Sequence, residues 1–289
     1  MKVPAWLPIL AAAIVGIQLG AAITVTRLIA ADVPPATIAL IRYLIGAACM
    51  APFLFRIDWR AMPWRDFFAI SALGIGQFGI LVALLNYGLI TVPAGRGAVL
   101  FSTVPVLALV LSVIFRGERL RLVPAIGVVL TILGVAVAVS NRDDWAGGVS
   151  TGDLVILASA LIGATTSVLY SPYVARYKAF PLGAFAMAAS VAFLVGPSIY
   201  EGALPDLVLH PEPRIWGALI FVGLSSAVAF GLWLWALGHT TPTRVTMFFA
   251  LGPVAAALLS AFWLGEHVTV PVQIGLVLVV AGLVVARRR

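Results

Sequence analysis

Residues 96–105 read RGAVLFSTVP and residues 244–253 read RVTMFFALGP, so Arg, Phe and Pro recur at one offset of 148 positions (244 − 96 = 148). The same offset relates Gly117-Glu118 to Gly265-Glu266. Matched Leu or Val residues carry little weight between apolar helices, whereas matched Arg, Pro and Gly-Glu are hard to obtain by chance. We interpret the match as an internal duplication, with one repeat over residues 1–145 and a second over residues 146–289.

The amino-acid composition places both repeats in a membrane. The 289-residue chain is 62% hydrophobic and 10% charged, whereas soluble proteins are about 45–50% apolar and about 25% charged. Apolar runs of about 20 residues, the length that a helix needs to cross the hydrocarbon core, recur along the whole chain. No stretch outside these runs is long enough to form a soluble domain. The composition therefore predicts a polytopic membrane protein.

We expect ten transmembrane helices, five in each repeat, and hence an all-α membrane protein. Short loops rich in Pro, Gly and charged residues separate the apolar runs. The expected spans are residues 5–28, 36–55, 67–90, 95–115, 121–140, 153–173, 182–200, 214–237, 243–264 and 270–286.

The Lys and Arg residues predict how the chain is oriented, because those near span ends are retained on the cytoplasmic side. If the N-terminus is cytoplasmic, most of the 18 Lys and Arg residues fall inside; the exceptions are Arg27, Arg42, Arg96, Arg142 and Arg214. Both termini are therefore predicted to be cytoplasmic. This topology also explains the net charge of +7 without a nucleic acid partner, since the basic residues lie in short loops.

The odd number of spans in each repeat has a functional consequence. After five spans the second repeat enters the membrane from the opposite side, so the two repeats are predicted to be inverted. Secondary transporters commonly contain inverted halves that meet at the bilayer midplane and rock to give alternating access. A receptor or a scaffold has no physical need for this arrangement.

Four polar side chains within the spans are candidate substrate-binding residues. The 148-residue offset relates Gln18 to Thr166, and Gln77 to Ser225. A polar side chain inside a bilayer is costly unless it faces protein or a watery cavity. We therefore expect these four residues to converge on one central cavity that can hold an amino and a carboxyl group. Hydrogen bonding between helices, without any substrate, is the alternative.

Aromatic side chains are expected to form apolar walls for this cavity. The residues are Phe78, Phe101, Tyr170 and Trp233. Tyr170 shares a helical face with Thr166, and Trp233 shares one with Phe230 and Ser226, because residues three, four or seven apart lie on the same side of a helix. Small-molecule pockets are generally lined in this way, although contact with lipid is the alternative for most of the 15 Phe residues.

Two prolines are candidate hinges. Pro105 and Pro253 each remove a backbone hydrogen bond inside an apolar run and are expected to kink the helix. Their matched positions in the fourth and ninth spans suggest one hinge for each gate. A static packing kink is the alternative.

Arg42, which lies several residues into the second span, and two glutamates at span ends have mainly structural interpretations. We expect Arg42 to extend to the outer interface or to pair with a helix end; direct binding of a substrate carboxylate is the alternative. Glu118 and Glu266 begin the fifth and tenth spans, where the positive end of a helix dipole favours a carboxylate. We therefore interpret both as helix caps.

Several motifs are absent from the sequence. There is no Gly-x-x-x-x-Gly-Lys-Ser/Thr loop for ATP and no His-Glu or Cys-rich cluster for zinc or for catalysis, so we expect neither an enzyme nor a cofactor. No carboxylate lies in the middle of a span, and His239 is only near the end of one. Because proton-coupled carriers usually need a buried titratable group, we expect facilitated, downhill transport.

The motifs together resemble a known family. Pro105 ahead of Gly117-Glu118, Pro253 ahead of Gly265-Glu266, and Pro35 ahead of Leu40-Ile41-Arg42-Tyr43 are similar to EamA-type members of the drug/metabolite transporter superfamily. The resemblance covers essentially the whole chain. One departure is that His267-Val268 follows Glu266, where Arg-Leu follows Glu118.

The resemblance implies both a fold and a function. Spans 1, 3, 4, 6, 8 and 9 are expected to line a central cavity, with spans 5 and 10 as peripheral supports. The most similar branch comprises bacterial inner-membrane exporters of amino acids, including aromatic ones, and of related metabolites. A proton-exchanging exporter of drugs or amines is the alternative within transport, and a non-transporting scaffold is the alternative outside it. The small-residue faces at Gly127, Gly134, Gly275 and Gly282 allow packing within one chain or between two copies in a homodimer.

Overall fold

The computed structural model describes residues 4, 6–57, 62–116, 122–139, 149–177, 179–209, 211–239, 248 and 251–286. Within these ranges the chain forms helices joined by short connections, and no strand. Six helical stretches are long and apolar enough to cross a membrane, and three shorter apolar helices accompany them. The architecture is that of an all-helical polytopic membrane protein, as the composition predicted.

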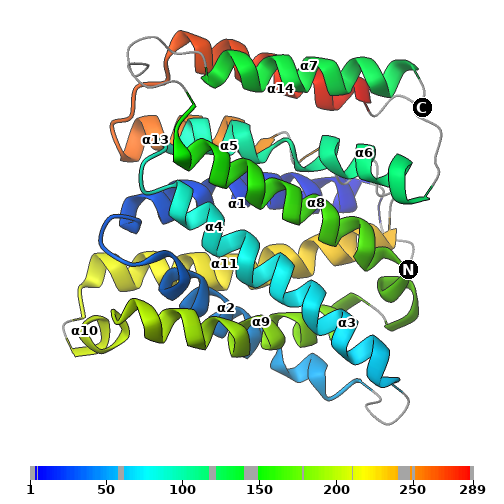
Figure 1. Ribbon diagram of the computed structural model, residues 1–289, viewed down its shortest axis with the longest axis vertical. Helices are drawn as coiled ribbons and strands as arrows, with labels where there is room; N and C mark the ends of the chain where they lie inside the picture. The colour runs from blue at the N-terminus through cyan, green and yellow to red at the C-terminus, as the bar shows by residue number, and fades with distance from the viewer. Residues whose placement is uncertain are drawn as a thin grey trace.

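Figure 1 shows the helices in chain order. The first half contains α1 (Trp6–Ile29), α2 (Pro35–Leu54), α3 (Trp64–Gly74), the π-helix η1 (Ile75–Ile80), α4 (Leu81–Gly88), α5 (Ala94–Phe101), α6 (Val104–Arg116) and α7 (Leu122–Val139). The second half contains α8 (Thr151–Tyr177), α9 (Ala179–Glu201), α10 (Leu204–Leu209), α11 (Pro213–His239), α13 (Leu251–Trp263) and α14 (Val270–Ala286). The third expected span comprises α3, η1 and α4, and the fourth comprises α5 and α6. Of the ninth expected span, the structure describes α13 and Phe248.

Prolines mark the start of several helices. α2 begins at Pro35, while α3 and α5 begin directly after Pro63 and Pro93. Proline has no backbone N–H and has a fixed φ near −65°, so it fits the first turn of a helix, where N–H groups have no partner within the helix. The X-Pro loops that separate the apolar runs thus define where the next helix begins.

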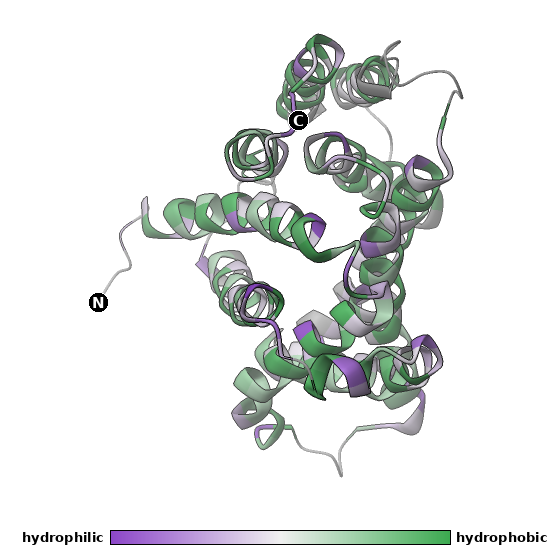
Figure 2. Cartoon of the chain, turned by 90° about the vertical axis from the view of Figure 1, so that its left-hand side faces the viewer, coloured by the Kyte–Doolittle hydropathy of each residue, from purple (hydrophilic) through white to green (hydrophobic). Residues whose placement is uncertain are grey.

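The outer surface of the bundle is apolar. On α13, for example, Leu258 and Phe262 expose 67% and 83% of their surface. Figure 2 shows that the helices consist mostly of hydrophobic residues and that strongly hydrophilic residues are few. Such a surface would be unfavourable in water but suits lipid, where apolar side chains have no reason to be buried.

Helices α7 and α14 form a separate pair. They lie side by side at one end of the bundle in Figure 1, and outside this pair they pack mainly against α5 and α6. A Cβ added to Gly134 would lie 2.8 Å from the Gly275 carbonyl oxygen, and one added to Gly282 would lie 2.7 Å from the Gly127 carbonyl oxygen. These glycines therefore permit close packing within one chain, and they provide no evidence for a homodimer.

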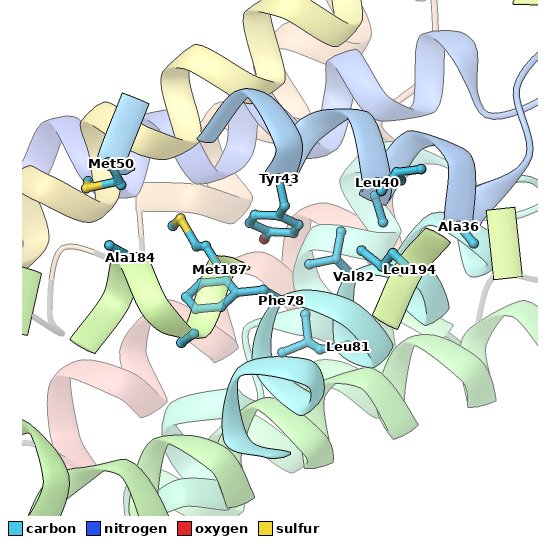
Figure 3. Close-up of a cluster of buried hydrophobic side chains, with 12 residues drawn as sticks. Ala36, Leu40, Tyr43, Met50, Phe78, Leu81, Val82, Ala184, Met187 and Leu194 are labelled. Carbon is cyan, nitrogen blue, oxygen red and sulfur yellow. The ribbon is translucent and has the colours of Figure 1, made fainter. Parts of the chain in front are cut away.

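The buried core beside the candidate site joins three parts of the chain. Figure 3 shows side chains of α2, of the η1–α4 region and of α9 in one cluster. Tyr43 of α2, Phe78 of η1 and Met187 of α9 are among its buried members. The cluster therefore holds the first and second halves of the chain together next to Phe78.

Candidate functional site

The four polar candidates form two hydrogen-bonded pairs between helices. Nε2 of Gln18 on α1 donates to Oγ of Ser225 on α11 over 3.0 Å. The Thr166 hydroxyl on α8 donates to Oε1 of Gln77 on η1. The 148-residue offset converts the first pair into the second, since it relates Gln18 to Thr166 and Gln77 to Ser225. Each bond joins the first half of the chain to the second half.

Both glutamine side chains retain hydrogen-bonding capacity. Oε1 of Gln18, an acceptor, and Nε2 of Gln77, a donor, have no partner among the residues that the structure describes. Both residues are partly exposed, so these atoms are open to a ligand or to water. The hydrogen bonding between helices that we considered as an alternative is thus present, and it occupies only one end of each amide.

A π-helical turn positions Gln77 and Phe78. The N–H of Leu81 donates to the carbonyl of Gly76, five residues earlier. Gly76 also permits a close approach of α8, because an added Cβ would lie 2.9 Å from Cγ2 of Thr166. π-helical turns are rare and occur frequently at functional sites. The sequence periodicity carries no signal for this turn.

Two glycines of α1 determine which way Gln18 points. Cβ atoms added to Gly16 and Gly20 would lie 1.9 Å and 2.3 Å from the carbonyl oxygens of Phe248 and Gly252. These glycines therefore face the backbone of the ninth span. Gln18 lies two residues from each of them, on another side of the helix, where it meets α11.

Four aromatic rings form a continuous line, which we call the aromatic wall. The ring centroids of Tyr43 and Phe78 are 5.2 Å apart, those of Phe78 and Phe230 are 5.4 Å apart, and those of Phe230 and Trp233 are 5.7 Å apart. Figure 3 shows the first two rings next to each other, close to Met187. The wall includes the predicted residues Phe78 and Trp233, and it adds Tyr43, which we did not predict to lie there.

The other two predicted aromatic residues lie beside this wall. Phe101 and Tyr170 are partly buried and pack against the core cluster that contains Phe78. Two buried polar atoms, the Tyr170 hydroxyl and Nε1 of Trp233, have no hydrogen-bond partner among the described residues. Because an unsatisfied buried polar group costs about 1–3 kcal/mol, both atoms are suited to bonding a ligand or water.

Arg42 does not extend outward or pair with a helix end, contrary to our expectation. The side chain lies inside the bundle with the residue only 9% exposed, and its Nε donates to Oγ of Ser226 over 2.8 Å. Ser225 and Ser226 are adjacent on α11, which packs against both α1 and α2. Gln18 therefore reaches one serine while Arg42 reaches the other. The two adjacent serines, Ser225 and Ser226, within an apolar span were the sequence signal for this arrangement.

Of the two candidate hinge prolines, Pro105 lies in the first turn of a helix. The fourth span is interrupted at Ser102 and Thr103, and Pro105 is the second residue of the helix that follows. A proline in the first turn disrupts no hydrogen bond of the helix, so Pro105 follows a break in the span and does not kink a continuous helix as we expected. Pro253 lies in α13, but residues 249 and 250 before this helix lie outside the described residues, so the expected kink there is not tested. Their role as hinges stays a prediction.

Glu266 caps a different helix from the expected one. Its Oε2 accepts the N–H of Ala94, the first residue of α5, over 2.9 Å, and its Oε1 accepts Nε of Arg27 over 3.3 Å. We expected it to cap the tenth span, which begins only at Val270. The helix dipole of α5 accounts for the position of the carboxylate. Glu118, which matches Glu266, lies outside the described residues.

The fold and the site together define a class of protein. The chain crosses the membrane several times, and polar side chains are paired within the bundle beside an aromatic wall. Residues 6–140 and residues 150–288 each match the EamA-like transporter family. The chain belongs to the EamA-like transporter family.

The chain is also similar to several known proteins. It is 27% identical to a probable terminal-alkyne amino-acid exporter of Streptantibioticus cattleyicolor, covering 88% of this chain and 84% of that protein. It is 26% identical to an uncharacterized transporter of Archaeoglobus fulgidus, covering 93% and 95%. It is 24% identical to a probable amino-acid metabolite efflux pump of Escherichia coli, covering 87% and 85%. A crystal structure with 23% identity superposes with a TM-score of 0.64 over 99% of this chain and 97% of the other, which shows a shared fold.

Proposed function

We propose that the protein is a carrier that exports neutral and aromatic amino acids, and related small metabolites, from the cytoplasm across the bacterial inner membrane. The observation that carries the proposal is the two offset-related hydrogen bonds, Gln18 to Ser225 and Thr166 to Gln77, beside the aromatic wall. Free amide groups and apolar ring faces together suit a small zwitterion with an apolar side chain. The names of the relatives in Streptantibioticus and Escherichia, which mention amino acids, support this substrate class.

The carrier works by alternating access between two inverted five-helix halves, residues 1–145 and 146–289. The two interhelical hydrogen bonds support this arrangement, because the 148-residue offset converts the Gln18–Ser225 bond into the Thr166–Gln77 bond. The glycine contacts between α7 and α14 support it too, because the offset converts Gly127 into Gly275 and Gly134 into Gly282. Rocking of one half against the other opens the site between them to each side in turn.

Transport is downhill and needs no proton gradient. Among the described residues, the carboxylates of Asp66, Asp153, Glu201 and Glu266 lie near helix ends, where they pair with arginines or cap helices. We expect purified protein in liposomes to equilibrate radiolabelled neutral or aromatic amino acids without an imposed gradient. Uptake that requires a pH gradient contradicts the downhill mechanism, and no uptake across a broad amino-acid panel contradicts the proposed function.

Gln18→Ala and Gln77→Ala are expected to lower the initial rate of amino-acid uptake about tenfold or more, while the yield of folded protein falls less than twofold. Each substitution removes both the free amide end and one interhelical hydrogen bond, and such a bond in a membrane is worth only about 0.6 kcal/mol on average. Initial rates in liposomes and yields from size-exclusion chromatography provide the comparison. Thr165→Ala is a matched control, because the hydroxyl of Thr165 bonds only within α8. Equal losses in rate and in yield would show that the glutamines are only structural.

The inverted topology can be tested with single cysteines. In a Cys49→Ser background, which removes the one native cysteine, Glu118→Cys is expected to react only with reagent on the cytoplasmic side and His267→Cys only with reagent outside. The physical reason is that the two Gly-Glu segments are separated by an odd number of spans. Labelling of intact cells and of inverted vesicles with an impermeant maleimide provides the measurement. Reaction of both cysteines on the same side contradicts the inverted halves and, with them, alternating access.

A further inference from the structure

Arg42 carries a permanent charge inside the bundle. It is the eighth residue of α2, about 10 Å along the helix from Pro35, and α2 is long and apolar enough to cross a hydrocarbon core that is about 30 Å thick. A guanidinium group stays protonated in proteins. Because an isolated charge at this depth is costly, intramembrane charges face a cavity or a partner, and they mark substrate pathways.

No carboxylate neutralises Arg42 within the part of the chain that the structure describes. Its recorded partner there is the neutral hydroxyl of Ser226, which takes one N–H of the five that a guanidinium offers. The carboxylates that form ion pairs among these residues are Asp32, Asp66, Asp153 and Glu266, and their partners are Arg214, Arg176, Arg96 and Arg27, respectively. The positive charge of Arg42 therefore lacks a counterion in this part of the chain.

The surroundings of Arg42 continue into the candidate site. Gln18 and Arg42 bond to adjacent serines of α11, so they lie at the same level of that helix. The guanidinium carbon is 5.5 Å from the ring centroid of Tyr43, the first ring of the aromatic wall. Phe230, a further ring of the wall, lies one helical turn from Ser226 on the same face of α11.

We infer that Arg42 binds the carboxylate of the transported molecule, so that the site selects hydrophobic carboxylates, including amino acids, against amines that lack a carboxylate. With Nε held by Ser226, the two Nη groups have no partner among the described residues and can form the end-on, bidentate pair that carboxylates make with arginine. The apolar part of the ligand then lies along the aromatic wall. This inference rests on the proposed function, because it assigns the substrate class of the same site.

Three probes separate the contributions of the two charged groups of an amino acid. L-Phenylalanine carries both, 3-phenylpropionate carries only the carboxylate, and 2-phenylethylamine carries only the amine. We expect the first two to raise the Tm of the purified protein in detergent, and 2-phenylethylamine to leave it unchanged. The inference is overturned if 2-phenylethylamine raises the Tm as much as 3-phenylpropionate does. It is also overturned if neither L-phenylalanine nor 3-phenylpropionate raises the Tm. These outcomes need no variant protein.

Variants of Arg42 identify the group that binds. Arg42→Gln is expected to raise the Kd for both carboxylates about tenfold or more, because a charge-assisted bidentate pair becomes a neutral contact. Arg42→Lys, which keeps the charge without the planar geometry, is expected to bind with intermediate affinity. Arg214→Gln is the matched control: it removes an arginine whose side chain is 51% exposed and paired with Asp32, and its Kd values are expected to equal those of the wild type.

A structural role for Arg42 makes a different prediction. If the bond to Ser226 mainly held α2 against α11, Arg42→Gln would lower the Tm without ligand. Our inference expects the ligand-free Tm to be retained or raised, since the substitution removes an uncompensated buried charge. A lower ligand-free Tm together with unchanged Kd values for the carboxylates overturns it.

The outcomes also distinguish this inference from the proposed function. If the wild type moves no amino acid in liposomes but 3-phenylpropionate binds in an Arg42-dependent way, the proposed function fails and the carboxylate site stands. If the wild type moves phenylalanine and Arg42→Gln does so with an unchanged KM, the carboxylate site fails and the proposed function stands.

Discussion

Asp153→Asn is expected to destabilise the protein by about 3–5 kcal/mol, the range measured when one partner of a buried ion pair is removed. The Asp153 side chain is fully buried and forms a two-point pair with Arg96, Oδ1 to Nε over 2.9 Å and Oδ2 to Nη2 over 2.5 Å. It also accepts bonds from the backbone N–H and the hydroxyl of Ser150 over 2.9 Å and 2.8 Å. Asparagine leaves the Arg96 charge buried without an anion. Thermal unfolding of the purified protein in detergent provides the measurement.

Asp32→Asn is the matched control for this prediction. Asp32 also pairs with an arginine, Arg214, but the two side chains are 41% and 51% exposed. Exposed pairs contribute about 0–1 kcal/mol, so the control is expected to shift the Tm very little. The double variant Arg96→Met/Asp153→Leu is expected to recover part of the lost stability, because it removes both buried charges. Equal and small shifts for Asp153→Asn and Asp32→Asn contradict the argument.

Gly16→Ala is expected to abolish most of the folded protein. A Cβ at this position would lie 1.9 Å from the carbonyl oxygen of Phe248 and 2.8 Å from its carbonyl carbon. These are backbone atoms, which cannot move aside as the end of a side chain can. The helices would have to separate, and Gln18 on the same helix would lose its position against Ser225. Yield and peak shape in size-exclusion chromatography, measured on a fluorescent fusion, report the result.

Two other glycines serve as controls for Gly16. Cβ atoms added to Gly196 on α9 and Gly217 on α11 would meet no atom within 4 Å. Alanine is favoured over glycine in a helix interior by about 1 kcal/mol, so Gly196→Ala and Gly217→Ala are expected to leave the yield unchanged or to raise it. A wild-type yield and Tm for Gly16→Ala would contradict the close packing of α1 against the ninth span.

The sequence predicted the helical spans well because the signal for a span is local. A helix that crosses lipid must satisfy its own backbone hydrogen bonds and present apolar side chains over about 20 residues. The second span, expected at residues 36–55, is α2 (Pro35–Leu54), and the tenth, expected at residues 270–286, is α14 (Val270–Ala286). The structure differs at the fourth span, which is interrupted at Ser102 and Thr103.

The candidate site was predictable in part. The duplication related Gln18 to Thr166 and Gln77 to Ser225, because a repeat preserves equivalent positions even when the residue types differ. It did not predict which of these residues bond to each other, namely Gln18 to Ser225 and Thr166 to Gln77. This pairing depends on how the helices are rotated and crossed in the bundle, which hydropathy does not record.

The sequence by itself determined that this protein is a bundle of membrane helices, that it consists of two related halves, and that polar residues lie inside its apolar spans. The tertiary structure decided the direction of Arg42, the helix that Glu266 caps, and the π-helical turn around Gln77. The physical reason is that the first set of features depends on residues close together in the sequence, and the second on contacts between distant helices. Transfer of a helix into lipid depends on its own residues, whereas the partner of a buried polar group depends on whichever helix lies against it.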